Sequence, residues 1–319
     1  MTKNYLPQNV FEAACDRLRY VCDHFENIYV SFSGGKDSGV LLNLAIDIAR
    51  ERGRLPVQVL VIDHEAQYRH TVDYIMRMVS RPEVKVWWVC LPLRLRNAAG
   101  RSRSHWLCWD PDWRGEWARD YPDHPGVITD PAYFPFFREG MAFEEFALAF
   151  GQWLGGDRDT ACLTGIRADE SLDLFRAIRS PARATFGGKS WSTAITGRLC
   201  NFYPLYDWRV RDIWIANGKR RYDYNRVYDV MHEAGVSLHR QRLCQPCGDD
   251  RREGLHLFKI LEPGTWARIV HRVEGAGAGA GDRDTGAGAA LAGHAGAFPG
   301  ERERARESTA CPEAPAPGQ

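Results

Sequence analysis

The hydrophobic positions of the chain follow two periods that alternate along most of its length. Apolar side chains recur at helical spacing over residues 9–26, 39–50, 71–79, 141–154 and 168–179. Short and nearly continuous apolar runs occupy residues 28–32, 57–62, 84–90 and 161–164. Such runs are typical of strands that a parallel sheet buries on both faces. Strands that alternate with helices predict an α/β fold with a doubly wound, mostly parallel sheet.

Three stretches depart from this alternation and indicate domain boundaries. Residues 91–140 are rich in Arg, Trp, Pro and Asp and are too long for an ordinary connection, which predicts a functional insertion in a first domain of residues 1–197. Residues 198–273 hold short helix-like pieces and predict a helical C-terminal extension. Residues 274–319 are rich in Gly and Ala and poor in large apolar side chains, which predicts a disordered, low-complexity tail.

Composition narrows the class of protein. The chain has 44% hydrophobic and 26% charged residues and a net charge of +1, so it can build a sizeable core. This charge excludes neither a nucleotide nor a nucleic acid as ligand, and it does not by itself indicate a protein that coats DNA. It has no run of about 18 apolar residues, so no membrane span is expected. The N-terminus lacks an uninterrupted apolar segment and the 9 cysteines are scattered, which predicts a cytoplasmic protein with mostly free thiols.

A loop with two glycines carries the strongest chemical signal. The segment Ser33–Ser38 (SGGKDS) joins a predicted strand to a predicted helix. Glycines let the backbone approach an anion, and the N–H groups of the first helical turn then point at it. The serine hydroxyls and Lys36 add further donors. The segment therefore predicts a phosphate or pyrophosphate site, and the alternative is a plain strand–helix turn with a capping serine.

Three segments together resemble a known group of proteins. SGGKDS resembles the PP-loop of the ATP pyrophosphatase (adenine nucleotide alpha hydrolase-like) superfamily. Residues 163–171 (LTGIRADES) resemble a motif of its phosphoadenosine phosphosulfate (PAPS) reductase branch, and residues 201–228 resemble that branch's PL-x-DW segment with a Tyr-rich helix. The resemblance covers about residues 25–260. It implies the fold of that superfamily and an adenine nucleotide as ligand: ATP, PAPS or adenosine phosphosulfate (APS).

The same resemblance implies roles for single residues. The residues that it implies in nucleotide binding are Ser33, Gly34, Gly35, Lys36, Asp37, Ser38, Asp63, Gly165 and Arg167. Of these, Lys36, Asp37 and Arg167 are the candidate catalytic residues, and Asp63 stands where family members contact the adenosine. Arg167 has an alternative role in an ion pair with Glu170. Asp37 is a candidate Mg²⁺ ligand, because hard cations prefer carboxylate and phosphate oxygens, and its alternative role is that of a helix-capping acceptor.

The cysteines depart from the pattern of a PAPS reductase. That family places its nucleophilic cysteine in a C-terminal E-C-G-[IL]-H motif, which this sequence lacks, and Cys311 has neither the flanking Gly nor the His. The pair Cys244 and Cys247 is open to three interpretations: structural thiols, a redox or substrate-sulfur role, or half of a metal site. The sequence contains no second pair of this kind, so zinc or an iron–sulfur cluster is not expected.

Two further segments resemble a narrower subgroup. Residues 241–252 and 90–112 are similar to a PAPS-reductase-like subgroup of unknown function that is often encoded beside ParB-like proteins, which implies a ParB-like partner. Residues 94–117 combine arginines with tryptophans, among them Arg94, Arg96, Arg101, Arg103, Trp106, Trp109, Trp113 and Trp117. Arginines neutralise phosphates and indoles stack on bases, so this segment is a candidate site for single-stranded nucleic acid or a second nucleotide. The alternative is a surface cover whose tryptophans pack onto the sheet.

Three functions are compatible with these features, because one phosphate loop serves all of them. The first and preferred function is an enzyme that cleaves the α–β bond of ATP and adenylylates a substrate, as a step towards sulfur transfer. The second is a PAPS or APS sulfotransferase-like reductase that uses a cysteine of the 244/247 pair. The third is a nucleotide-sensing regulator that works with a partner protein.

Overall fold

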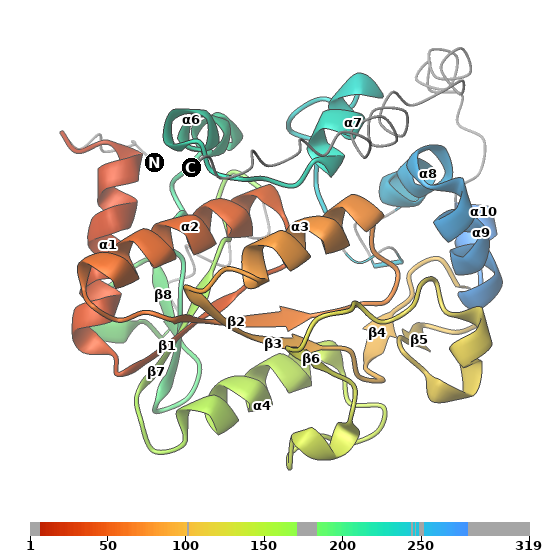
Figure 1. Ribbon diagram of the computed structural model, residues 1–319, viewed down its shortest axis with the longest axis horizontal. Helices are drawn as coiled ribbons and strands as arrows, with labels where there is room; N and C mark the ends of the chain where they lie inside the picture. The colour runs from red at the N-terminus through yellow and green to blue at the C-terminus, as the bar shows by residue number, and fades with distance from the viewer. Residues whose placement is uncertain are drawn as a thin grey trace, which may run out of the picture. The chain divides into compact units, whose positions relative to one another are not determined.

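A seven-stranded, mostly parallel sheet forms the centre of the fold (Figure 1). The structure is a computed structural model that describes residues 7–100, 102–170, 184–243, 245, 247–248 and 252–279. Its strands are β1 (Asn27–Ser31), β2 (Val57–Ile62), β3 (Val84–Val89), β6 (Val127–Ile128), β7 (Thr160–Thr164), β8 (Ser192–Ala194) and β9 (Leu199–Phe202). Their order is β6-β3-β2-β1-β7-β9-β8, and only the β8–β9 pair is antiparallel. The predicted α/β fold is confirmed.

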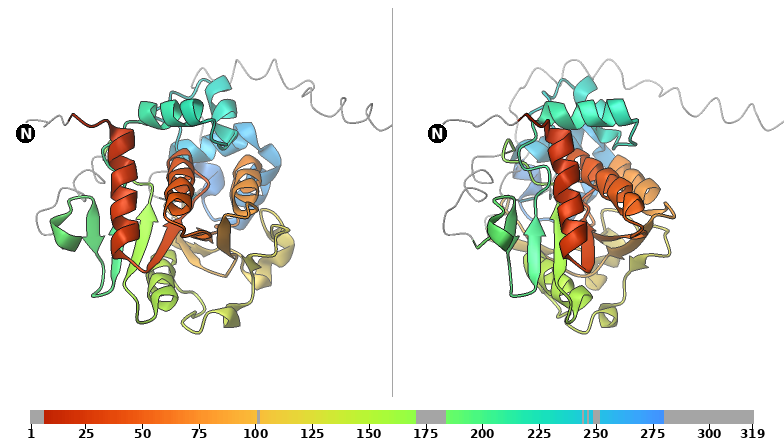
Figure 2. Two further views of the ribbon diagram at one scale, coloured as in Figure 1. Left: turned by 60° about the vertical axis from the view of Figure 1, so that its left-hand side comes forward. Right: turned by 90° about the vertical axis from the view of Figure 1, so that its left-hand side faces the viewer.

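Helices cover both faces of this sheet. They are α1 (Val10–His24), α2 (Lys36–Glu51), α3 (Arg69–Val79) and α4 (Phe143–Gly155). Helices α1, α2 and α3 lie on one face and α4 lies on the other (Figures 1 and 2). The first helix begins at a capping box, in which the Asn9 side chain accepts a hydrogen bond from the Glu12 backbone N–H at 3.0 Å. These helices and their strands lie within a few residues of the predicted ranges, because local hydrophobic periodicity determines them.

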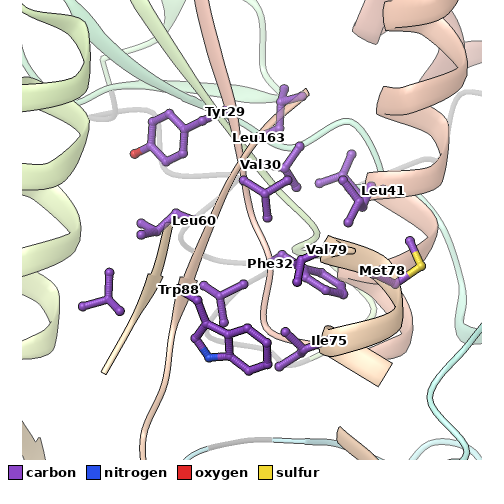
Figure 3. Packing of buried hydrophobic residues seen from close by; sticks show 14 of the residues in the cluster. Tyr29, Val30, Phe32, Leu41, Leu60, Ile75, Met78, Val79, Trp88 and Leu163 are labelled. Atoms are coloured by element: carbon purple, nitrogen blue, oxygen red, sulfur yellow. The ribbon is translucent and has the colours of Figure 1, made fainter. Parts of the chain in front are cut away.

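The apolar core consists of two layers separated by the sheet (Figure 3). Val30 of β1 faces Leu41 of α2, and Phe32 at the end of this strand packs on α3, with its ring centroid 5.8 Å from that of Tyr74. Tyr29 points the opposite way, and its ring lies 5.4 Å from that of Phe150 on α4. Because successive side chains of a strand alternate between faces, β1 is buried on both sides and holds the loop that follows it in a fixed position.

The predicted insertion of residues 91–140 is partly integrated into the sheet. Strand β6 lies within this range and pairs with β3 at the sheet edge. The rest includes a two-stranded ribbon, β4 (Arg94–Arg96) and β5 (His105–Leu107), and two 3-10 helices, η1 (Pro111–Glu116) and η2 (Pro131–Tyr133). A run of two strand residues is too short to give a periodic signal, so the sequence did not predict β6.

The C-terminal region differs from the prediction at both of its boundaries. The predicted boundary after residue 197 falls between β8 and β9, which pair with each other, so β9 belongs to the central sheet. A 3-10 helix, η3 (Phe186–Gly188), precedes this pair of strands. The helices that follow the pair are α6 (Val210–Arg220), α7 (Val227–Glu233), α8 (Arg252–Leu261), α9 (Pro263–Arg272) and α10 (Ala276–Gly279). Helix α6 packs on α2 near the start of α1 (Figure 2), where Trp208 Nε1 donates to the Val10 carbonyl at 2.9 Å.

The range predicted as a disordered tail begins with residues that the structure describes as ordered. Helix α10 lies inside the range 274–319, and the compact unit that contains it extends to Gly281. The remainder of the predicted tail lies outside the described residues, and so does most of the predicted helix at 168–179. None of the described helices is long and apolar enough to span a membrane.

Candidate phosphate site

The loop Ser33–Ser38 turns directly from β1 into α2. Gly34 has a φ of +72°, a left-handed conformation that favours glycine, and a Cβ there would lie 2.8 Å from Ile75 Cγ1. Gly35 is the N-cap of α2 and provides no side chain to cap it. The hydroxyls of Ser33 and Ser38 lie 3.1 Å apart. The loop therefore brings backbone N–H groups, two hydroxyls and the positive end of a helix dipole together, as an anion site requires.

A second loop meets the first one at the start of α2. Gly165 follows β7, the neighbour of β1, and an ideal Cβ at this position would lie 2.8 Å from the Ser38 backbone nitrogen. Only glycine therefore permits this approach of the two backbones. Strand β1 has β2 on one side and β7 on the other, so the two loops meet where the strand order reverses, the usual place for ligands in open α/β sheets.

Three charged side chains from these loops form a buried cluster. The Asp37 carboxylate pairs with the Lys36 ammonium at 3.2 Å and with the Arg167 guanidinium. Lys36 and Arg167 are each only 3% exposed. Arg167 also lies 3.5 Å from Asp169, whereas Glu170 pairs with Arg242 at 3.3 Å. The carboxylates that pair with Arg167 are therefore those of Asp37 and Asp169. The ion pair with Glu170, which was the alternative role of Arg167, does not form.

The C-terminal region reaches the same cluster, a contact that the sequence did not predict. The Tyr228 hydroxyl accepts a hydrogen bond from the Lys36 backbone N–H at 3.0 Å, and the Lys36 ammonium donates to the Gln241 carbonyl at 2.9 Å. Asn225 donates to the Gly34 carbonyl at 2.9 Å. Asn225 and Tyr228 lie within residues 201–228, the segment that resembles the PL-x-DW segment with its Tyr-rich helix. This resemblance was the sequence signal that could have identified them as site residues. Gln241 acts through its backbone, so no side-chain pattern marks it.

Asp63 directly follows β2, and its buried carboxylate contacts groups inside the protein. Its side chain is 0% exposed. It accepts hydrogen bonds from the Glu65 backbone N–H and from Trp88 Nε1, both at 2.9 Å, and it pairs with the Arg119 guanidinium. In this arrangement the carboxylate orders the turn after β2, and its contact with an adenosine stays a prediction.

Burial disfavours the thiolate form of the cysteines in the described part of the chain. Burial raises the pKa of every thiol there: Cys15, Cys22, Cys90, Cys108, Cys162, Cys200 and Cys247. Cys247 is 1% exposed and its pKa is raised to about 12. Because the thiolate is the nucleophile and the metal ligand, this burial favours the interpretation of Cys247 as a structural thiol, and its redox and metal roles stay predictions. Cys244 and Cys311 lie outside the described residues.

The tryptophans of residues 94–117 are mostly buried. Trp106, Trp109 and Trp117 are between 1% and 9% exposed, and Trp113 is 43% exposed. Three of the four indoles therefore pack inward, as the alternative interpretation of a surface cover requires. Arg101 lies outside the described residues.

The residues at the loop do not form a metal site of the protein alone. Both carboxylate oxygens of Asp37 face cations, so Mg²⁺ would have to displace Lys36 or Arg167 to bind there. In the part of the chain that the structure describes, no group of three or more His, Cys, Asp or Glu side chains is placed to hold a metal ion. The two buried cations, Lys36 and Arg167, are placed to neutralise part of the charge of a phosphate at this loop.

The architecture is that of an α/β protein with a glycine-containing loop at the switch point of a mostly parallel sheet. Residues 27–99 match the family model of the phosphoadenosine phosphosulfate reductase domain. Residues 235–291 match a domain of unknown function (DUF3440). The two matched segments meet at the hydrogen bond between Lys36 and Gln241.

Comparison with known proteins gives one extended sequence similarity. The chain is 40% identical over 275 residues to "Uncharacterized protein YbdN" of Escherichia coli (strain K12), which covers 85% of this chain and 66% of that protein. The chain thus spans slightly less than two thirds of the relative's length.

The solved structures that resemble the chain have low sequence identity. The PAPS reductase of Candida auris is 14% identical with a TM-score of 0.38, and the alignment covers 72% of this chain and 94% of the reductase. The FMN adenylyltransferase of Candida glabrata is 16% identical with a TM-score of 0.38, covering 70% and 62%. The U34-tRNA thiolase NcsA of Methanococcus maripaludis is 13% identical with a TM-score of 0.39, covering 84% and 80%.

Proposed function

We propose that this protein is an enzyme that binds ATP at the Ser33–Ser38 loop, cleaves its α–β bond and transfers the adenylyl group to an acceptor, as a step towards sulfur transfer. The convergence of Lys36 and Arg167 on Asp37 carries this proposal. Two buried cations from two different loops lie beside the glycines, at the place where α/β sheets bind ligands. A triphosphate is the kind of ligand that compensates two buried positive charges.

Each residue of the cluster has a role in this reaction. The acceptor's nucleophilic atom forms a bond to the α-phosphorus while the bond from this phosphorus to the bridging oxygen breaks, and pyrophosphate leaves with the electron pair. Lys36 and Arg167 neutralise the negative charge that grows on the pyrophosphate, and the loop amides orient it. Asp37 holds both cations in position before the nucleotide binds.

The state of the thiols favours this function over a sulfotransferase-like reductase. A reductase needs a thiolate to attack the sulfate sulfur, and burial holds Cys247 in its neutral form, because it raises the pKa of this thiol to about 12. A regulator that binds nucleotide without turnover, a ParB-like partner and a cytoplasmic location stay predictions from the sequence.

The test measures two products in parallel. Pyrophosphate release from ATP, with water as the default acceptor, and sulfite release from PAPS with thioredoxin are followed for the wild type and for Lys36→Ala. Lys219→Ala is the control, because Lys219 is an exposed residue of α6. We expect pyrophosphate release that Lys36→Ala lowers about 100-fold and Lys219→Ala leaves unchanged. Sulfite release faster than pyrophosphate release would contradict the proposal, and nucleotide binding without either product would favour the regulator.

A further inference from the structure

Arg242 is the residue that follows the carbonyl bound by Lys36. The Gln241 carbonyl accepts a hydrogen bond from the Lys36 ammonium at 2.9 Å, and Gln241 is 1% exposed. Because the carbonyl carbon of Gln241 is bonded to the Arg242 nitrogen, this contact holds the Arg242 backbone within about 5 Å of the ammonium. The segment 235–291, which matches the domain of unknown function, thus reaches the phosphate loop near its beginning.

The Arg242 side chain extends to the second loop of the site, the one that follows β7. Its guanidinium lies 3.3 Å from the Glu170 carboxylate, and the Glu170 backbone N–H donates to the Arg167 carbonyl at 3.2 Å. The side chains of Arg242 and Glu170 are 25% and 20% exposed. Arg242 therefore brings a third, partly exposed cation to the two loops that carry Lys36 and Arg167.

Two guanidinium nitrogens of this region are buried without a hydrogen-bond acceptor. In the part of the chain that the structure describes, no group accepts a hydrogen bond from Arg242 Nε or from Arg167 Nη1. The Asp169 carboxylate lies 3.5 Å from Arg167 Nη1, which is longer than an ordinary N–H···O bond. Burying a donor without an acceptor is unfavourable, so both groups would gain from a ligand that is rich in oxygen.

A phosphate is the ligand that suits the Arg242 guanidinium. Arginine binds phosphate through two parallel N–H bonds, and Nε is a donor available for such a pair. The contact with Glu170 is made by Nη2 and is partly exposed to solvent, so it is a weak ion pair that a multiply charged phosphate can replace. Glu170 is then the counterion of Arg242 only until the nucleotide binds.

We propose that Arg242 is a further catalytic residue, which leaves Glu170 to bind the β- and γ-phosphates of ATP and the pyrophosphate that departs. This inference rests on the proposed ATP chemistry and extends it, because it gives the C-terminal segment a part in the reaction. Lys36 and Arg167 neutralise the pyrophosphate from the two loops of the sheet, and Arg242 adds a third charge from the segment that contacts Lys36.

The experiment is calorimetric titration of the full chain with ATP, inorganic pyrophosphate and AMP. Arg242→Ala should weaken binding of ATP and of pyrophosphate by about 30-fold, because it removes hydrogen bonds between charged groups. AMP lacks the β- and γ-phosphates, so its affinity should stay unchanged. Arg242→Lys keeps the charge without the planar fork and should weaken both ligands less than Arg242→Ala does. Arg211→Ala removes an exposed charge of α6 and should leave all three affinities unchanged.

Glu170→Gln separates phosphate binding from a structural role of the ion pair. If Arg242 binds phosphate, this change removes its competitor and should strengthen binding of ATP and pyrophosphate by about threefold. If Arg242 only held the second loop through Glu170, the two variants Glu170→Gln and Arg242→Ala would weaken ATP binding alike. Equal losses in these two variants would therefore overturn the inference.

The outcomes also separate this inference from the proposed function. A wild type that binds ATP and pyrophosphate, together with unchanged affinities in Arg242→Ala, would overturn the role of Arg242 and leave the ATP chemistry in place. A wild type that binds neither ligand would contradict both. If Arg242→Ala does not fold, Arg242→Lys and Glu170→Gln give the same test, because the inference requires weaker pyrophosphate binding in the first and stronger binding in the second.

Discussion

Gly165 and Ser38 are in backbone contact: a Cβ on Gly165 would lie 2.8 Å from the Ser38 nitrogen and 3.0 Å from its Cα. Two loops that are distant in the sequence share this contact, one after β1 and one after β7. It holds Arg167 against Asp37 and so determines the separation of the two buried cations. The contact is between backbones, so a side chain at 165 cannot rotate away from it.

Gly165→Ala tests this contact. The added methyl group must push the two loops apart, so we expect a loss of about 1–3 kcal/mol in the free energy of unfolding and weaker nucleotide binding. Gly218→Ala is the matched control, because Gly218 lies in α6 with nothing within 4 Å of its ideal Cβ, and alanine there should be neutral or stabilise by up to about 1 kcal/mol. Urea unfolding and ATP titration measure both effects. Equal behaviour of the two variants would contradict the close approach.

Tyr228→Phe tests how the C-terminal region acts on the loop. The change removes the hydroxyl that accepts from the Lys36 N–H and leaves this buried donor without that partner, which should cost about 1–3 kcal/mol in the absence of nucleotide. A bound phosphate would then take the place of the hydroxyl, so the ATP-induced rise in melting temperature should be larger than in the wild type. A rise equal to that of the wild type would indicate that phosphate does not reach this N–H group.

The thiol of Cys247 should be unreactive in the native protein at neutral pH. Burial raises its pKa to about 12, so the folded state keeps the proton that the unfolded state loses at lower pH. The folded state therefore loses stability relative to the unfolded state as the pH rises from the ordinary thiol pKa towards 12. Iodoacetamide labelling followed by peptide mass spectrometry should modify Cys247 at pH 8 only after denaturation. Rapid native labelling would support the redox interpretation of the 244/247 pair.

The sequence predicted those parts of the fold and site that depend on local pattern. Strand β2 was predicted with its observed bounds. Five of its six residues are apolar, and such a run is recognisable in a short stretch of sequence. The loop Ser33–Ser38 was also recognisable from a short stretch of sequence, because glycines, serines and a lysine at a strand–helix junction are typical of an anion-binding loop. The alternation of Leu93, Arg94, Leu95 and Arg96 was a period-2 signal for the ribbon that the composition of the insertion obscured.

The contacts that complete the site could not be predicted in this way. Lys36 lies 192 residues from Tyr228 and 205 residues from Gln241, and one of these contacts uses a backbone carbonyl. No local periodicity encodes such a pairing. The short strand β6 exists because an edge of the sheet is available for it, which is a property of the folded chain and not of its two residues.

Arg119→Ala tests the role of Asp63. Removing the guanidinium leaves a buried carboxylate without its cation, which should cost about 3–5 kcal/mol in the free energy of unfolding. Arg114→Ala is the control, because Arg114 is exposed in the same segment and its loss should stay within about 0.5 kcal/mol. Urea unfolding and ATP titration are measured for both. Unchanged stability together with weaker ATP binding would instead place Asp63 in contact with the nucleotide.

Truncation separates the observed C-terminal boundary from the predicted one. A chain that ends after Arg272 loses Val273 and Ala276, which are 1% and 0% exposed, and the Glu274 carbonyl that accepts from Asn97 at 3.0 Å. The lost burial should lower the free energy of unfolding by about 2 kcal/mol, and a chain that ends after Gly281 should keep full stability, because the compact unit ends there. Urea unfolding of the two truncated chains and of the full chain measures the difference. If the chain that ends after Arg272 were as stable as the full chain, the boundary predicted from the glycine-rich composition would be correct and α10 would add nothing to the fold.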